Sequence, residues 1–272
     1  MDTPTALIDI GVNLTNRRFH GLEQQLISRA RDAGVERMII TGTDEASSSA
    51  AIALCERFGE EFPHCLYSTA GIHPHDAKSA DAASLAQIRA LAASATVVAI
   101  GETGLDFNRD FSPRPQQEQA FAAQLELAAE TGLPVFMHQR DAHGRFVEIL
   151  RHYRDHLADG VVHCFTDNRQ ALFDYLDLDL HIGITGWVCD ERRGAELQGL
   201  VGNIPLSRLM LETDAPYLLP RNLQPRPKNR DNEPAYLPAV LAAVAQHGGF
   251  GPTELAQATR LTSERFFRLQ PR

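Results

Sequence analysis

Short runs of apolar and β-branched residues alternate along the chain with longer stretches in which apolar residues recur every three or four positions. The first pattern is typical of buried strands and the second of amphipathic helices, so their alternation predicts βαβ units and a parallel sheet. The expected strands are residues 6–10, 37–41, 66–71, 97–101, 134–138, 160–163, 180–184 and 209–212. This succession predicts an α/β protein with a closed (β/α)8 TIM barrel, and an open doubly wound sheet is the alternative.

Helix and loop signals between the strands agree with this organisation. Residues 116–131 are expected to form a helix that stops at Gly132, because glycine adopts the left-handed conformation common just after a helix. Residues 214–232 carry several prolines and arginines without periodicity, which predicts a long functional loop after the last strand. Asn232 is expected to cap the following helix, and two helical stretches, 236–246 and 252–269, end the chain.

Composition places the chain among ordinary globular proteins. It has 272 residues, of which 43% are hydrophobic and 22% charged, and without a repeat or linker this predicts one domain over residues 1–272. The absence of a long apolar run or a basic leader predicts a cytoplasmic protein that does not enter membranes, and a monomer is the default. The net charge of −9 argues against a broad basic surface for nucleic acid, so an anionic substrate must be held locally.

Polar side chains follow one predicted strand after another. They are Asn13 after the first, His73 after the third, Glu102 after the fourth, His138 after the fifth, His163 after the sixth and Asp214 after the eighth. Barrel enzymes carry their catalytic groups at this end of the strands. Imidazoles and carboxylates that meet there suit a divalent ion that activates water. Cys164 should face away from His163, because neighbouring strand residues point to opposite faces.

Several ordered motifs resemble one family. The segments are DIGVNL (9–14), GIHPH (71–75), IGETGLD (100–106), PVFMH (134–138), HCFT (163–166) and ETDAPYL (212–218). Together they resemble the TatD family of metal-dependent DNases, within the amidohydrolase-like superfamily, over essentially the whole chain. ITGWVCD (184–190) further resembles the branch that gives the family its name. The resemblance implies a (β/α)8 barrel, a divalent metal ion and hydrolysis of phosphodiester bonds. For that branch it implies 3'-to-5' exonuclease activity on single-stranded DNA, with RNA as a second substrate and a role in DNA repair or degradation.

Carried over residue by residue, the resemblance makes Glu102, His138 and His163 metal ligands. Asp214 becomes either a further ligand or the base that orients the attacking water. One departure concerns the first strand, where most relatives carry a His-x-His pair and this chain has Gly-Val-Asn at residues 11–13. We therefore expect one firmly bound ion and a second that is weak or arrives with the substrate. Magnesium is the expected ion, and manganese and zinc also suit the ligand set.

The remaining candidates surround these ligands. Asp214 is expected to accept a proton from the attacking water, and His73 to contact the phosphate or protonate the leaving oxygen unless it only orders a turn. Arg140 is expected to grip a phosphate, or else to pair with Asp141. Asp106 lies in the predicted loop after the fourth strand, where it either orients a ligand histidine or orders the loop.

Asn13 completes the residues expected to bind substrate, together with Arg140 and Asp106. Phe107, Trp187 and Tyr217 are candidates for stacking on bases. A small-molecule amidohydrolase or phosphotriesterase-like enzyme is the main alternative, because the same barrel and ligands serve that chemistry. A non-catalytic scaffold is the second alternative, which the intact ligand candidates disfavour.

Overall fold

The computed structural model describes residues 6–269, whose strands form one eight-stranded sheet in which each strand runs parallel to the next. The strands are β1 (Leu7–Val12), β2 (Val35–Ile40), β3 (Leu66–Ala70), β4 (Val97–Asp106), β5 (Val135–Arg140), β6 (Gly160–Val162), β7 (His181–Ile184) and β8 (Leu209–Leu211). Every predicted strand is therefore present.

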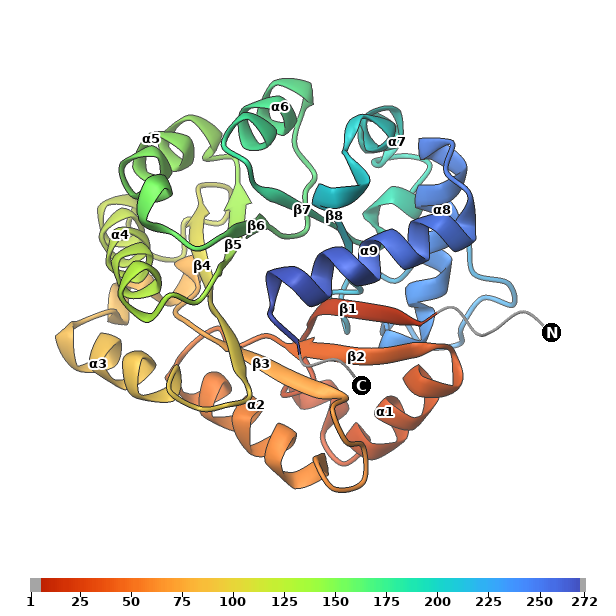
Figure 1. The fold of residues 1–272 in the computed structure, drawn as a ribbon, viewed down its shortest axis with the longest axis horizontal. Coiled ribbons are helices and arrows are strands. Elements are labelled where there is room, and N and C mark those ends of the chain that lie inside the picture. The colour runs from red at the N-terminus through yellow and green to blue at the C-terminus, as the bar shows by residue number, and fades with distance from the viewer. Residues whose placement is uncertain (1–5, 270–272) are drawn as a thin grey trace.

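A helix follows each strand along the chain, and the helices lie outside the strands or across one end of the barrel (Figure 1). They are α1 (Glu23–Asp32), α2 (Glu45–Phe58), α3 (Ala82–Leu91), α4 (Arg114–Thr131), α5 (His143–Tyr153), α6 (Arg169–Asp177), α7 (Ala195–Leu200), α8 (Leu237–Gly248) and α9 (Pro252–Phe266). The predicted stop of α4 at Gly132 is confirmed, because this residue has a φ of 68° and closes the helix. Within residues 6–269, none of the helices combines the length and apolar character that crossing a membrane requires.

The last strand meets the first, which closes the sheet into a barrel. The N–H of Asp214 donates to the carbonyl of Gly11 at 2.9 Å, and the N–H of Asn13 donates to the carbonyl of Ala215 at 2.8 Å. A parallel bridge joins Val12 to Ala215 at the same place. The closed TIM barrel is confirmed over the open doubly wound sheet, and the closure sets Asn13 beside Asp214.

The fourth strand is longer than predicted and includes Glu102 and Asp106. Two glycines allow it to run this close to β5: a Cβ at Gly101 would lie 2.2 Å from the carbonyl oxygen of Phe136, and one at Gly104 would lie 1.9 Å from that of His138. Both glycines have a φ near +140°, which side chains disfavour. Asp106 therefore ends a strand rather than lying in a loop, which corrects the sequence prediction.

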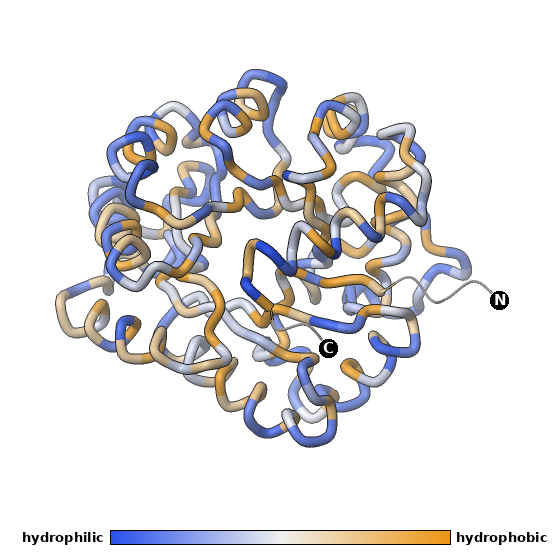
Figure 2. The backbone as a smooth tube through the Cα atoms, viewed as in Figure 1, coloured by the Kyte–Doolittle hydropathy of each residue, from blue (hydrophilic) through white to orange (hydrophobic). Residues whose placement is uncertain are grey.

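Apolar side chains fill the barrel and close one of its ends. Ile10, Ile39, Phe136 and Met210 belong to one buried cluster, which also contains Phe266 at the end of α9. Figure 1 shows α9 lying across that end of the barrel. Figure 2 shows hydrophobic residues concentrated along the strands and hydrophilic residues on the outer turns of the helices. Because this apolar cluster closes one end of the barrel, the carboxyl ends of the strands form its open, polar face.

The loop after β8 is irregular, as predicted, but its last residue does not cap a helix. Asn232 is fully buried, and its side-chain amide donates to the carbonyl of Thr213 at 2.9 Å. A short 3-10 turn, Pro234–Tyr236, follows, and Glu233 occupies its cap position. The expected role of Asn232 is therefore wrong: its amide ties the far end of the loop to the end of β8.

Candidate metal centre and substrate pocket

A cavity of about 570 Å³ opens at the carboxyl ends of the strands. All the polar residues that the sequence placed after the strands line it: Asn13, His73, Glu102, His138, His163 and Asp214. Asp106 and Arg140 line the same cavity. The barrel thus brings together the residues predicted as metal ligands, catalytic groups and phosphate contacts.

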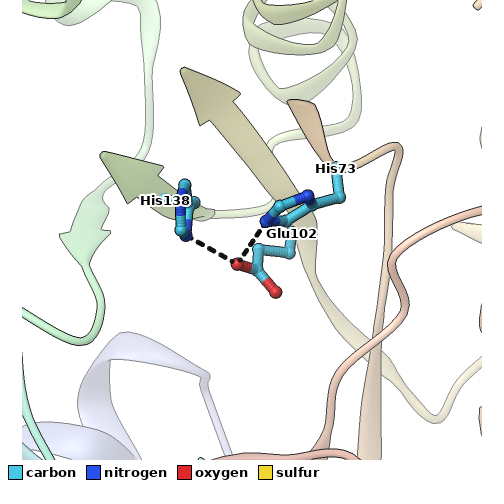
Figure 3. Close-up of side chains that lie close together, drawn as sticks. All are labelled: His73, Glu102 and His138. Carbon is cyan, nitrogen blue, oxygen red and sulfur yellow. Dashed lines mark ion pairs between the residues drawn. The ribbon is translucent and has the colours of Figure 1, made fainter. Parts of the chain in front are cut away.

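Three imidazole rings converge on one oxygen of Glu102. The Oε1 atom lies 2.8 Å from Nε2 of His163, 3.1 Å from Nδ1 of His138 and 3.2 Å from Nε2 of His73. Figure 3 shows His73 and His138 pointing at Glu102 from opposite sides. One ligand atom from each of these three residues lies within 4.8 Å of the other two, a spacing that could hold a metal ion. His73 therefore lies among the candidate ligands. Its Nδ1 also accepts the N–H of His75 at 3.1 Å, which is the turn-ordering alternative to the expected phosphate contact or leaving-group protonation.

The charged groups of this cluster stabilise the ionised forms of their neighbours. Burial raises the pKa of Glu102, but His163 and His73 together with hydrogen bonds from His138 and His163 hold that pKa well below its usual range. Burial lowers the pKa of His163, but Glu102 and Glu212 raise it well above its usual value. The cluster thus keeps the buried Glu102 ionised, as a carboxylate ligand requires.

Glu212, which the sequence reasoning assigned no role, holds His163 from behind. Its side chain is 0% exposed, its Oε2 lies 3.3 Å from Nδ1 of His163, and its Oε1 accepts the N–H of Cys164. Gly11 and Gly183 leave space for it, since a Cβ on either would lie 2.5 to 2.7 Å from a Glu212 oxygen. A carboxylate behind a ligand histidine fixes the ring and its tautomer. Its signal in the sequence is a charged residue at the end of a buried strand.

Asp106 contacts two histidines and the loop that follows β4. Its Oδ2 lies 2.8 Å from Nε2 of His75 and 3.3 Å from Nε2 of His138, while its Oδ1 accepts the N–H groups of Asn108 and Arg109. Burial raises its pKa, but the bonds from His138 and His75 hold the pKa far below the usual value. The charged carboxylate thus orients His138 with Nδ1 toward the centre and orders the loop at the same time.

Two buried glutamines of α4 position the loop segments beside the site. Gln124 accepts the N–H of Ile72 at 2.7 Å and donates to its carbonyl at 3.0 Å, directly before His73. Gln117 makes the same pair of bonds with Asp106, at 2.8 Å and 3.2 Å. Each glutamine side-chain amide thus pairs with a buried backbone N–H and C=O that would otherwise lack these hydrogen-bond partners. Sequence reasoning missed both, because a polar residue in a helix usually faces water.

Asp214 and Asn13 form a pair at the seam of the barrel. The side-chain amide of Asn13 donates to Oδ1 of Asp214 at 3.0 Å and also to the carbonyl of Ala215. Burial raises the pKa of Asp214 to about 7, and the charges of Glu102 and Glu212 add to the effect. A carboxyl group with this pKa can take up and release a proton near neutral pH. Asn13 therefore positions Asp214 as well as lining the cavity.

Cys164 faces the cavity, so its predicted outward orientation is wrong. The alternation of strand residues does not reach it, because β6 ends at Val162 and Cys164 has a φ of 48°. Its Sγ lies 3.8 Å from Oγ1 of Thr185. Burial raises the pKa of the thiol well above its usual value, with further contributions from Asp214 and Glu212. The group is thus held as a neutral thiol.

Arg140 points along the cavity wall toward an aromatic residue. Its guanidinium carbon lies 5.9 Å from the ring centroid of Trp187. Asp141, its alternative partner, accepts a bond from Asn108 at 2.7 Å, and no ion pair joins it to Arg140 among the described residues. The guanidinium fork is therefore available to an anion in the cavity.

A (β/α)8 barrel with histidine and carboxylate ligand atoms at the carboxyl ends of its strands belongs to the class of metal-centred TIM-barrel hydrolases. A family model described as TatD related DNase matches residues 8–268. The chain belongs to this family, as the resemblance of its motifs indicated.

Curated relatives are similar over nearly the whole chain. A protein of Pectobacterium carotovorum named 3'-5' ssDNA/RNA exonuclease TatD is 50% identical over 97% of this chain and 100% of its own length. A protein of the same name from Yersinia pseudotuberculosis is 52% identical with the same coverage. Among solved structures, the TatD homologue YJJV of Escherichia coli K12 is 28% identical, with a TM-score of 0.88 over 98% of this chain and 100% of that chain.

Proposed function

We propose that this chain is a metal-dependent exonuclease that removes nucleotides from the 3' end of single-stranded DNA and RNA. Relatives that carry this activity in their names are about half identical over nearly the full length. The observation that carries the proposal is the convergence of His73, His138 and His163 on one oxygen of Glu102 inside the cavity.

The donor set fits a divalent cation. Imidazole nitrogens and carboxylate oxygens suit Mg²⁺, Mn²⁺ or Zn²⁺, and ligand atoms of His73, Glu102 and His138 lie within 4.8 Å of one another. We propose Glu102, His138 and His163 as the main ligands, with His73 beside them and Asp214 as a further ligand or a base. A bound cation would supply charge neutralisation at the phosphate and lower the pKa of water. We further propose that the ion is magnesium and that the chain has one firm metal site. Elemental analysis that shows two tightly bound ions per chain would contradict the single site.

The chain's own residues supply the remaining functions. Asp214, with a pKa of about 7, accepts the proton of the attacking water at its carboxylate. Asn13 holds Oδ1 of that carboxylate by a hydrogen bond at 3.0 Å. Asp106 and Glu212 fix the rings of His138 and His163. Arg140 grips a phosphate oxygen pair of the strand with its planar fork.

The test uses a single-stranded oligonucleotide labelled at either its 3' or its 5' end. Metal-stripped protein receives Mg²⁺, Mn²⁺ or Zn²⁺ separately, alongside Glu102→Ala and the exposed control Glu60→Ala. We expect a ladder shortened from the 3' end that requires metal, is absent in Glu102→Ala and is unchanged in Glu60→Ala. An intact fold without cleavage under any metal would overturn the proposal in favour of a small-molecule metallohydrolase. Cytoplasmic location, a monomeric state and a role in DNA repair or degradation stay predictions.

A further inference from the structure

Exposed aromatic side chains gather at the mouth of the cavity. Among the described residues, three large apolar side chains are exposed: Leu22, Phe111 and Tyr217. Tyr217 is 45% exposed and lines the cavity, whereas Phe111 is 57% exposed and meets the ring of the cavity residue His75 at 4.7 Å between centroids. An exposed ring that contributes little to packing indicates a surface for contact with another molecule.

Trp187 adds a third ring to the same mouth. It is partly exposed, lines the cavity and belongs to a 3-10 turn, Gly186–Cys189, after β7. Its indole N–H donates to the carbonyl of Arg193 at 3.2 Å, which fixes the ring. The predicted Phe107 is not one of these rings: it packs against the core under Arg114 and is absent from the described cavity lining.

Arginines accompany two of these rings. The guanidinium carbon of Arg193 lies 4.3 Å from the centroid of Trp187, and that of Arg18 lies 5.5 Å from the centroid of Tyr217. The hydroxyl of Tyr217 accepts a bond from Asn16 at 3.1 Å, so this ring is held in place as well. Rings fixed before binding lose little conformational freedom when a ligand stacks on them. Fixed rings match a ligand with flat faces, and both arginines are already paired with carboxylates, Arg193 with Asp190 and Arg18 with Asp231.

We propose that Phe111, Trp187 and Tyr217, here termed the aromatic rim, are stacking positions for unpaired nucleobases next to the scissile phosphate. This inference rests on the proposed exonuclease function and adds how the strand is held. A base inside a duplex already has both faces stacked, whereas a single strand offers free faces. The aromatic rim therefore selects single strands by their exposed bases, independently of sequence.

The experiment compares an ordinary single-stranded oligonucleotide with one that carries reduced abasic residues at its last three 3' positions. The proteins are the wild type, Phe111→Ala, Trp187→Ala and Tyr217→Ala. The control Leu22→Ala removes an exposed apolar side chain that does not line the cavity. KM is measured with metal, and Kd by fluorescence anisotropy in chelator. Circular dichroism melting confirms that each variant is folded.

Loss of one stacked base weakens binding by about 5- to 140-fold. We expect each alanine variant to raise KM and Kd for the ordinary strand by a factor in this range. On the abasic strand, wild type and alanine variants should then differ by less than twofold, while Leu22→Ala behaves as wild type on both strands.

Equal KM and Kd for variants and wild type on the ordinary strand would overturn the aromatic rim. An equal loss on both strands would do the same, because it would place the effect on something other than bases. Failure of the wild type to cleave any strand would instead reject the exonuclease function, and the Kd values in chelator would still decide whether bases stack on these rings.

Discussion

Replacing Asp214 with asparagine tests the effect of its carboxyl group both on stability and on catalysis. In the folded protein, burial and the charges of Glu102 and Glu212 raise the pKa of Asp214 from 3.8 to about 7. The folded protein therefore holds a proton that the unfolded chain releases between these two pH values. Consequently the free energy of unfolding falls as pH rises from about 4 to 7.

The difference between 3.8 and about 7 corresponds to a loss of up to about 4 kcal/mol at pH 7 and above. Asp214→Asn does not titrate, so it should be more stable than wild type at pH 8, and this advantage should vanish near pH 4. Urea unfolding followed by circular dichroism in chelator, at pH 4, 5, 6, 7 and 8, measures the effect. The exposed Asp155→Asn is the matched control.

The same substitution removes the proton acceptor, so exonuclease turnover should fall by about 100- to 10,000-fold. In the wild type, turnover should decline below about pH 7 as Asp214 takes up a proton, and ligand histidines that bind protons add to the decline. A stability difference between Asp214→Asn and wild type that stays constant from pH 4 to 8 would refute the electrostatic reasoning. A turnover rate that does not change between pH 5 and 8 would refute the role as a base.

Three further predictions concern the buried glutamine that positions the site, a metal ligand and the phosphate contact. Gln124→Leu leaves the N–H and C=O of Ile72 without this partner, so it should lower the free energy of urea unfolding by about 2–5 kcal/mol. The exposed Gln24→Leu should change it by less than about 0.5 kcal/mol, and equal losses in the two variants would contradict a stabilising role of the Gln124–Ile72 bonds. Divalent metal at a hundredfold excess over Kd should stabilise the folded wild type by about 2.7 kcal/mol and so raise its melting temperature. Glu102→Ala should abolish this rise in melting temperature, and a retained rise would place the metal elsewhere. Arg140→Lys keeps the charge but loses the fork, so KM for an oligonucleotide should rise about tenfold, and an unchanged KM would exclude a bidentate grip.

The sequence alone determined the strands and most residues of the site. Burial of a strand and the apolar stripe of a helix are local properties, so all the expected strands and the end of α4 at Gly132 were predicted correctly. The parallel strands of a barrel all end at one face. Glu102, His138 and His163 can therefore be grouped from their positions at strand ends, before any contact between them is known.

Tertiary structure alone decided how these residues are held and what surrounds them. Gln124 and Glu212 act through partners 52 and 49 residues away, so no local pattern reveals them. Cys164 turned into the cavity because the backbone left the strand, and Phe111 was recognised at the mouth only from its exposure beside His75. Local sequence fixes which face a residue prefers, whereas the partner that it meets depends on how distant segments close around the barrel.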